Sequence, residues 1–184
     1  MAWRGSHHGN VPSTLTHLEC SRPSCRTVLE HTKPQNLCPI CQSPLLARYD
    51  LKAARRTLTR EALLHRTRSM WRYEEVMPAV APVTLGEGMT PLLHATRLGA
   101  HLGLERLYIK DEGQNPTSSF KARGLSAAVS VATALGLETI ALPSAGNAGG
   151  AAAAYAARAG LRCVVAMPAD TPAAIVLECR AFGA

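Results

Sequence analysis

The sequence lacks several features that would place it in other classes of protein. No stretch is long and apolar enough to cross a bilayer, and the N-terminus has no apolar run followed by a small-residue cleavage site. Its arginines form no basic block and are not interleaved with aromatic residues, which make up only 4% of the chain. We therefore expect a cytoplasmic protein with no membrane partner, and we do not expect it to bind nucleic acid.

Charge and composition divide the chain into a basic front and a nearly neutral remainder. Residues 1–75 hold twelve Lys and Arg against six Asp and Glu, whereas residues 76–184 hold eight against seven. We interpret the basic residues as a solvated face. The 47% hydrophobic content is enough for a packed core and argues against disorder.

Four segments follow from these shifts in composition. We expect a mobile N-terminus at 1–13, a zinc-ribbon-like module at 14–48 and a basic connecting segment at 49–80. The fourth segment, 81–184, is dominated by Ala, Gly, Leu and Val and has the composition of a layered core.

The last segment alternates between two kinds of hydrophobic pattern. Short apolar runs with branched residues predict strands, and apolar residues three and four apart predict helices. The order strand, helix, repeated three times, predicts an α/β fold with a parallel sheet wrapped by crossover helices. The expected strands are 106–110, 138–143 and 161–168, and the expected helices are 125–135, 148–159 and 172–182, the last with Thr171 as N-cap.

Four of the six cysteines have a spacing that is typical of a zinc ribbon. They read Cys20-x4-Cys25-x12-Cys38-x2-Cys41, and the short "CPIC" turn lets two thiolates reach one tetrahedral ion. A structural zinc ion is the prediction, with an empty ribbon, or ligation by His17 or His31, as alternatives. The absence of a secretory signal disfavours disulfides. Cys163 and Cys179 lie in an expected strand and helix and are interpreted as small buried hydrophobes.

Two loops carry residues that are suited to chemistry on an amino acid. Lys121 lies in "NPTSSFKARG" just before an expected helix, and Asn147 lies in "PSAGNAGG", which follows a strand and begins another helix. Free N–H groups at a helix start attract an anion. A surface lysine and an ordinary strand-to-helix turn are the simpler explanations of each loop alone. Together they suit a substrate that is held by its carboxylate while its amine reacts.

Three ordered motifs resemble the pyridoxal-phosphate enzymes of fold type II, most closely the threonine synthases. They are "GEGMTPLL" (86–93), "KDEGQNPTSSFKARG" (110–124) and "LPSAGNAGGAAAAYAARAG" (142–160). A cysteine-bearing ribbon ahead of the first motif is also similar to some threonine synthases. The resemblance implies that 81–184 is the N-terminal part of a truncated catalytic domain that binds pyridoxal 5'-phosphate.

The resemblance also implies roles for individual residues. Lys121 matches the lysine that forms a Schiff base with the cofactor and later moves protons at the substrate carbons. Asn147 matches the asparagine that hydrogen-bonds the cofactor ring oxygen, and Phe120 supports the ring environment. Ser144, Gly146 and the helix start, with Asn147 and Ala148, match the loop that holds the substrate carboxylate. Ala148 stands where some threonine synthases have a hydroxyl residue near the substrate phosphate.

The implied function is conversion of O-phospho-L-homoserine and water into L-threonine and phosphate, with a small-molecule amino-acid substrate. The resemblance further leads us to expect that the 184 residues are an inactive N-terminal fragment of a longer protein, and that this protein forms a homodimer. A threonine or serine dehydratase, or a related ammonia-lyase, is the alternative enzyme. A non-enzymatic zinc-ribbon binding module is the alternative of another class, and it leaves Lys121 and Asn147 unexplained.

Overall fold

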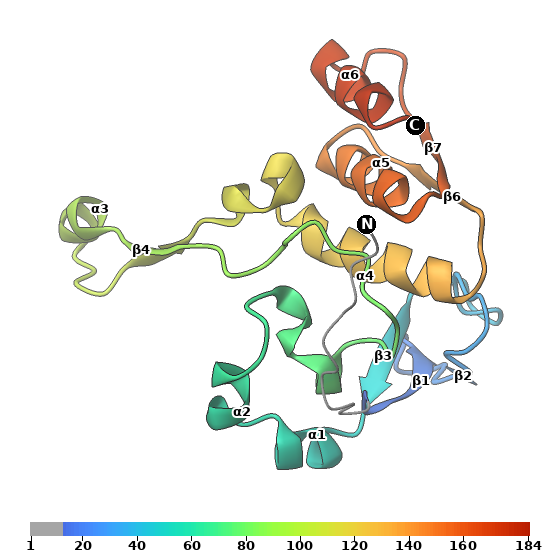
Figure 1. Cartoon of the computed structure of the whole chain (residues 1–184), viewed down its shortest axis with the longest axis horizontal. Helices are drawn as coiled ribbons and strands as arrows, with labels where there is room; N and C mark the ends of the chain where they lie inside the picture. Colours follow the sequence, from blue (N-terminus) through green and yellow to red (C-terminus); the bar gives the residue numbers. More distant parts are fainter. Residues whose placement is uncertain (1–12) are drawn as a thin grey trace, which may run out of the picture. The chain divides into compact units, whose positions relative to one another are not determined.

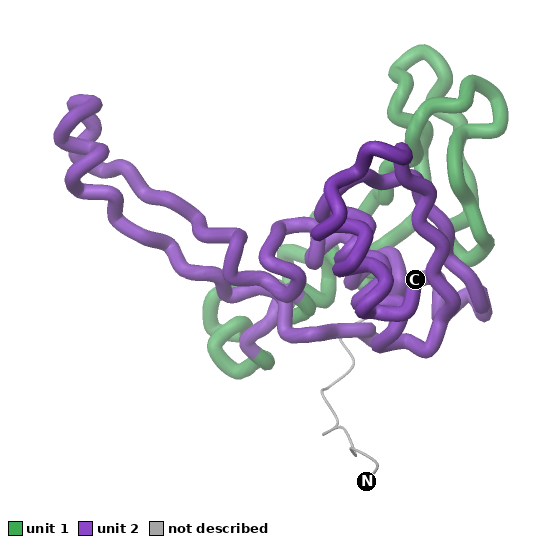
Figure 2. The backbone as a smooth tube through the Cα atoms, turned by 90° about the horizontal axis from the view of Figure 1, so that it is seen from above, with its two compact units in different colours: residues 1–67, 71–79 green, residues 68–70, 80–184 purple. Residues whose placement is uncertain are grey.

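The computed structural model describes residues 13–184, which fall into two compact units (Figure 2). Unit 1 comprises residues up to 67 together with 71–79, and unit 2 comprises 68–70 and 80–184. Across residues 13–184, no helix is long and apolar enough to cross a membrane.

Unit 1 combines a small antiparallel sheet with short helices. The sheet has the strand order β2-β1-β3, formed by β1 (Leu15–Cys20), β2 (Val28–Leu29) and β3 (Leu45–Tyr49). Asp50 then caps α1 (Leu51–Thr57), because its carboxylate accepts from two amides of the first turn. Thr59 caps α2 (Arg60–Leu64) with its hydroxyl, which accepts from the Ala62 amide. The short 3-10 helix η1 (Met70–Arg72) begins at the last residue of the unit 2 segment 68–70, and η2 (Glu74–Val76) lies in unit 1.

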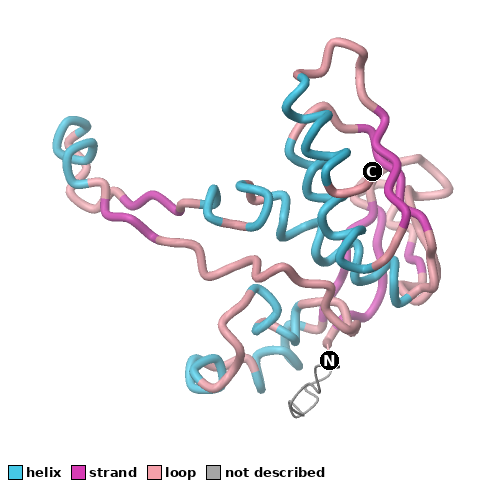
Figure 3. Tube along the Cα trace, turned by 45° about the horizontal axis from the view of Figure 1, so that its top comes forward, coloured by secondary structure: helices cyan, strands magenta, loops and turns pink. Residues whose placement is uncertain are grey.

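Unit 2 contains a parallel strand pair with its crossover helix. Strands β6 (Thr139–Pro143) and β7 (Arg162–Ala166) pair in parallel, and α5 (Asn147–Ala159) connects them. Figure 3 shows α4 (Lys121–Ala134), α5 and α6 (Ala173–Ala181) beside this pair. The α/β class with crossover helices is thus confirmed.

The core of unit 2 is built from small side chains. Ala152, Ala153 and Ala156 of α5 are fully buried with Cys163 and Cys179, as predicted for these two cysteines. Since alanine lets two helix backbones approach closely, α4 and α5 pack tightly. A second buried cluster joins the two helices through Ala122, Val129 and Tyr155.

Two details of unit 2 differ from the sequence prediction. Helix α4 begins at Lys121, four residues before the expected start, because the Ala–Arg–Gly stretch after the lysine continues the helix. The Thr171 hydroxyl donates to the Pro168 carbonyl instead of capping α6, and Pro172 occupies the cap position.

The strand expected at 106–110 lies outside the parallel pair. It forms β5 (Tyr108–Lys110), which pairs antiparallel with β4 (Leu92–His94). Helix α3 (Thr96–Leu102) connects the two strands, and Figure 1 shows it at the tip of an arm. Gly103 ends α3 with φ of 68°, a left-handed conformation that turns the chain back toward β4. The antiparallel return therefore follows from the helix stop.

Candidate functional site

Lys121 is the first residue of α4, where the "NPTSSF" loop ends. Its side chain is half-buried, and Nζ lies 4.7 Å from the centroid of the exposed Phe120 ring. In the part of the chain that the structure describes, no carboxylate lies within ion-pair distance of this amine. An amine without a carboxylate partner remains available as a nucleophile.

The loop before Lys121 has a strained backbone. Thr117 has φ of 59° and Ser118 has φ of 50°, so two consecutive L-residues adopt the left-handed conformation. Such a conformation costs on the order of 1–3 kcal/mol per residue and persists only where neighbouring contacts hold it. The Ser118 amide donates to the Asn115 carbonyl at 2.9 Å, which closes the turn from one side.

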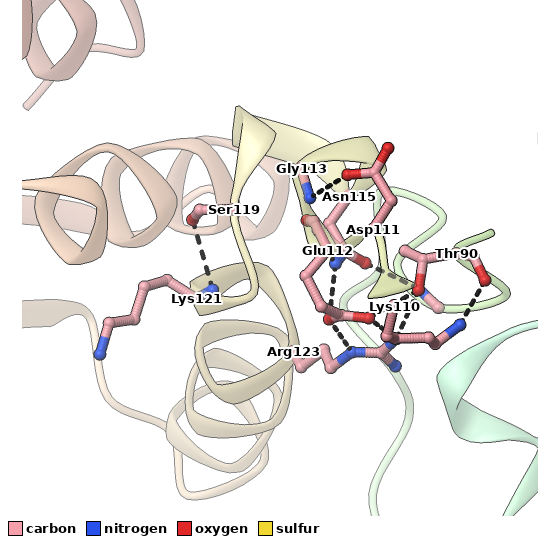
Figure 4. A network of polar contacts seen from close by, with 10 residues as sticks. Thr90, Lys110, Asp111, Glu112, Gly113, Asn115, Ser119, Lys121 and Arg123 are labelled. Atoms are coloured by element: carbon pink, nitrogen blue, oxygen red, sulfur yellow. Dashed lines mark hydrogen bonds and ion pairs between the residues drawn. The ribbon is translucent and has the colours of Figure 1, made fainter. Parts of the chain in front are cut away.

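The Glu112 carboxylate connects several elements around this loop (Figure 4). It accepts from Nε and Nη2 of Arg123 at 2.6 and 2.8 Å, from Thr90 Oγ1 at 2.6 Å and from Asn115 Nδ2 at 2.9 Å. The Arg123 guanidinium, more than the other donors, holds the pKa of Glu112 at about 2. Lys110 Nζ donates to the Thr90 carbonyl. Glu112 is therefore ionised at neutral pH and gathers charge-assisted hydrogen bonds.

A second carboxylate, Glu87, lies in the Gly-rich segment before β4 and is fully buried. It accepts from the Tyr155 hydroxyl at 2.6 Å, from Ser126 Oγ at 2.7 Å and from the Leu85 amide at 3.1 Å. Burial alone would raise the pKa of Glu87, but these donors outweigh it and lower the pKa. The segment that carries "GEGMT" is thereby joined to both α4 and α5.

The start of α5 is organised by Ser144. Its hydroxyl accepts from the amides of Gly149 at 2.9 Å and Gly146 at 3.3 Å and donates to the Gly146 carbonyl at 3.1 Å. Asn147 is the first residue of the helix and is exposed, and Ala148 follows it half-buried. Ser144 thus shapes the loop whose predicted task is to hold a carboxylate.

The two predicted loops belong to the same unit. The 3-10 helix η4 (Pro116–Ser118), just before Lys121, contacts α5, which begins at Asn147. No hydrogen bond joins the side chains of Lys121 and Asn147 in the described part of the chain. The structure therefore brings the lysine loop against the asparagine helix without joining the two functional groups.

The four predicted cysteines form one cluster in unit 1. The Sγ atoms of Cys20, Cys25, Cys38 and Cys41 all lie within 4.8 Å of one another, and those of Cys20 and Cys41 are 3.4 Å apart. Neither His17 nor His31 belongs to this cluster. Four sulfur atoms at this separation could hold a metal ion in tetrahedral geometry.

Two of these positions, Cys38 and Cys41, have neighbouring groups that favour the thiolate form. Burial opposes ionisation of Cys38, but the amides of Cys41 and Ile40 outweigh it and lower its pKa to about 6. Ser43 lowers the pKa of Cys41, whereas burial raises the pKa of Cys20 to about 12. Main-chain N–H groups that face a sulfur stabilise its ionised form, the form that binds metals.

Comparison with known proteins identifies the family. A family model described as "Pyridoxal-phosphate dependent enzyme" matches residues 83–184. The chain belongs to this family of pyridoxal-phosphate dependent enzymes. The resemblance inferred from the three motifs is confirmed at that level, and the non-enzymatic alternative does not describe residues 83–184.

Relatives within the family include several threonine synthases. The threonine synthase of Methanosarcina acetivorans is 38% identical over 156 residues, which cover 84% of this chain and 38% of the relative. That of Methanocaldococcus jannaschii is 41% identical over 123 residues, covering 65% of this chain and 30% of the relative. The chain therefore spans about a third of the length of these relatives.

Two solved structures also match part of the chain. Maize serine racemase aligns with a TM-score of 0.45 and 26% identity, over 51% of this chain and 29% of that chain. Threonine deaminase isoform 2 from Solanum lycopersicum aligns with a TM-score of 0.44 and 29% identity, over 51% of this chain and 26% of that chain.

Sequence reasoning assigned no role to three residues that organise this region. Glu87, Glu112 and Arg123 all lie in the quoted motifs, yet each reads as an ordinary surface charge in a linear pattern. The sequence signal for two of them was the spacing of Glu112, with Asn115 three residues later and Arg123 two residues after the lysine. Only the structure shows that Glu112 pairs with Arg123 and that Glu87 accepts from Tyr155.

Proposed function

We propose that this chain is the N-terminal part of a threonine synthase, which converts O-phospho-L-homoserine and water into L-threonine and phosphate. The observation that carries the proposal is Lys121, which has no carboxylate partner among residues 13–184 and begins a helix packed on α5, in a chain whose relatives include threonine synthases. All residues of β4 and β5 are exposed, and 63% of the Leu92 surface is accessible to solvent. Such apolar exposure suits one part of a larger enzyme.

The residues at the start of α4 and α5 fit pyridoxal phosphate. When bound, this cofactor supplies an electron sink for negative charge that develops on the substrate carbons. Lys121 would hold its aldehyde covalently, since no ion pair withdraws the amine. Phe120 would border the cofactor ring, and Asn147 would hydrogen-bond it.

The chain's own residues then have separate tasks. Lys121, once its amine is free, takes up and returns protons at the substrate carbons, because a positioned amine can act as both base and acid. The first amides of α5, at Asn147 and Ala148, bind the substrate carboxylate through the positive end of the helix. Ser144 and Gly146 keep the loop open for that anion.

A cytoplasmic location and a homodimer of the full-length enzyme complete the proposal. All six cysteines are free, and free thiols persist in reducing compartments. Fractionation of cells and the native mass of the full-length enzyme test these two points. Recovery with secreted protein, or a monomeric mass, would contradict them.

The decisive experiment compares the 184-residue chain with the continuous reading frame that encodes it. We expect the longer product to release phosphate and form threonine from O-phosphohomoserine, and the 184-residue chain to do neither. L-Threonine deamination serves as the control reaction. A longer product that deaminates threonine but ignores O-phosphohomoserine would assign the dehydratase reaction instead.

Borohydride reduction followed by peptide mapping tests the role of Lys121. The reduced cofactor should be attached at Lys121 and absent in a Lys121→Ala variant. Attachment at Lys110 or Lys52 with Lys121 unlabelled would refute the assignment.

We also propose that the four-cysteine cluster binds one structural zinc ion. The support is the separation of the sulfur atoms and the small sheet of unit 1, which is too short to provide much core of its own. Four protein ligands leave no open position, so the ion takes no part in catalysis.

Elemental analysis of protein purified without chelator decides this point. We expect one equivalent of zinc in the wild type, and its loss in a Cys38→Ser variant. The Cys163→Ser and Cys179→Ser double variant is the matched control, because these buried thiols lie outside the cluster, and it should keep its zinc. Less than about a tenth of an equivalent in the wild type, or iron in place of zinc, would overturn the assignment.

A further inference from the structure

The residues on both sides of the Lys121 loop bind the same carboxylate. Asn115 opens the loop and donates Nδ2 to Glu112 at 2.9 Å, and Arg123 follows Lys121 by two residues and donates two N–H groups to Glu112. The loop and the first turn of α4 are therefore closed into a ring by one side chain.

The carboxylate itself is anchored from outside the ring. Thr90 Oγ1 donates to Glu112 at 2.6 Å, and the Gly88 amide donates to Asn115 Oδ1 at 3.1 Å. Asn115 is buried and also donates Nδ2 to the Glu112 carbonyl at 3.0 Å. The ring is thus fixed to the "GEGMT" segment at two points.

Strain explains why the loop needs such a ring. Thr117 and Ser118 both hold positive φ, and the loop's own hydrogen bonds include a contact of 3.3 Å from the Lys121 amide to Ser119 Oγ, long for a strong bond. A loop in this conformation relaxes unless its ends are held. Figure 4 shows the Lys121 side chain directed away from Glu112, so the carboxylate acts on the backbone and not on the amine.

We propose that Glu112 is a positioning residue for Lys121: through Asn115 and Arg123 it holds the strained loop so that the lysine amine meets the cofactor aldehyde in one orientation. This inference rests on the proposed function, because it takes Lys121 as the cofactor lysine. Glu112 touches neither cofactor nor substrate in this role.

The test uses the whole chain and two readouts, neither of which is catalytic activity. The first is the ratio of borohydride-fixed pyridoxal phosphate at Lys121 to that at exposed Lys52, which is an internal reference in the same molecule. The second is hydrogen exchange of the amides from Thr117 to Arg123, compared with those of α5. The variants are Glu112→Gln and Arg123→Lys, with Asp111→Asn as the control. Arg123→Lys keeps the positive charge but loses the planar guanidinium that donates two hydrogen bonds.

Asp111 is a matched control because it is the neighbouring carboxylate and, among residues 13–184, accepts only local hydrogen bonds, from the Gly113 amide and the Gln114 side chain. We expect Glu112→Gln to lower the labelling ratio about tenfold and to speed exchange in the loop about tenfold, with α5 unchanged. Arg123→Lys should lie between this variant and the wild type. Asp111→Asn should stay within about twofold of wild type.

The two proposals fail in different ways. A wild type with no preference for Lys121 over Lys52 refutes the cofactor role of Lys121. A wild type that prefers Lys121, together with a Glu112→Gln variant of equal ratio and equal loop exchange, refutes the positioning role alone. If Glu112→Gln also loses protection from hydrogen exchange in α5, the whole unit has loosened. The Arg123→Lys variant then decides. An unchanged labelling ratio and unchanged loop exchange in that variant would overturn the inference.

Discussion

The ion pair between Arg66 and Glu75 offers a measurable test of how unit 1 is stabilised. Glu75 is fully buried, and its two carboxylate oxygens each accept a guanidinium N–H of Arg66 at 2.7 Å. Substituting Glu75 by Gln keeps the side-chain shape but removes the charge. The Arg66 guanidinium, which is itself only 12% exposed, then loses the closer of its two ionised partners and keeps Glu74 at 3.8 Å.

The pKa of Glu75 sets the magnitude of this loss. Hydrogen bonding to Arg66 lowers the pKa from 4.5 to about 2, in spite of burial. A difference of about 2.5 pH units corresponds to about 3 kcal/mol, since one unit is worth about 1.4 kcal/mol. Because the folded pKa is the lower one, this stability is present above pH ~4.5 and is lost as the pH falls toward ~2. We therefore expect Glu75→Gln to cost about 3 kcal/mol at neutral pH.

Fluorescence of buried Trp71 reports unfolding of unit 1, in a Trp3→Phe background that removes the other tryptophan. The free energy of unfolding is measured against urea at several pH values, and the variant is compared with wild type so that effects of acid on the cysteines cancel. Glu74→Gln is the matched control, because Glu74 lies 3.8 Å from Arg66 and is 32% exposed, and it should cost less than about 1 kcal/mol. Equal losses for the two variants, or a Glu75→Gln difference that persists undiminished toward pH ~2, would refute the reasoning.

Two further pairs of substitutions in unit 2, each a test variant with its control, have expected costs. Gly88→Ala should destabilise by about 3 kcal/mol, because φ is +105° and the new Cβ would lie 2.5 Å from the Met70 amide nitrogen, whereas Gly86→Ala, at φ of +98° with open space, should cost about 1 kcal/mol. Similar urea midpoints for the two alanine variants would contradict this. Tyr155→Phe should cost about 2 kcal/mol because it leaves buried Glu87 one donor short, while Tyr108→Phe on the exposed β5 should change stability by less than about 0.5 kcal/mol. Calorimetry of both tyrosine variants checks this, and a loss as large for Tyr108→Phe would rule it out.

The parts of the fold that the sequence predicted are those that local pattern determines. The parallel pair β6–β7 and helix α5 were predicted within a few residues, because branched apolar runs and an alanine-rich helix ending at Gly160 leave little ambiguity. The partner of β5 could not be predicted in the same way. A short run with branched and aromatic residues, such as "RLYIK" (106–110), indicates a strand, but its pairing with β4 depends on how α3 ends at Gly103.

The helices of unit 1 show the same limit from another side. α1 and α2 lie within the segment that was predicted only as a basic connection, 49–80, and their first residues are set by the caps Asp50 and Thr59. Residues that can cap a helix, such as Asp and Thr, are also common in loops. A single one of them therefore predicts a helix only when the residues that follow have a helical pattern.

In the candidate site, the reactive groups were predicted from the sequence, and the groups that hold them in place were not. Lys121 and Asn147 stand at helix starts, and a local motif is enough to place them there. Glu87 and Glu112 gain their meaning from partners that are distant in sequence: Glu87 binds Tyr155 across 68 positions, and Glu112 binds Thr90 across 22. A carboxylate is stable in such surroundings only when several donors converge on it, and convergence is a property of the folded chain. Glu112 also shows why this matters for function, since a lysine amine can be correct in identity and still be misdirected if its strained loop is not held.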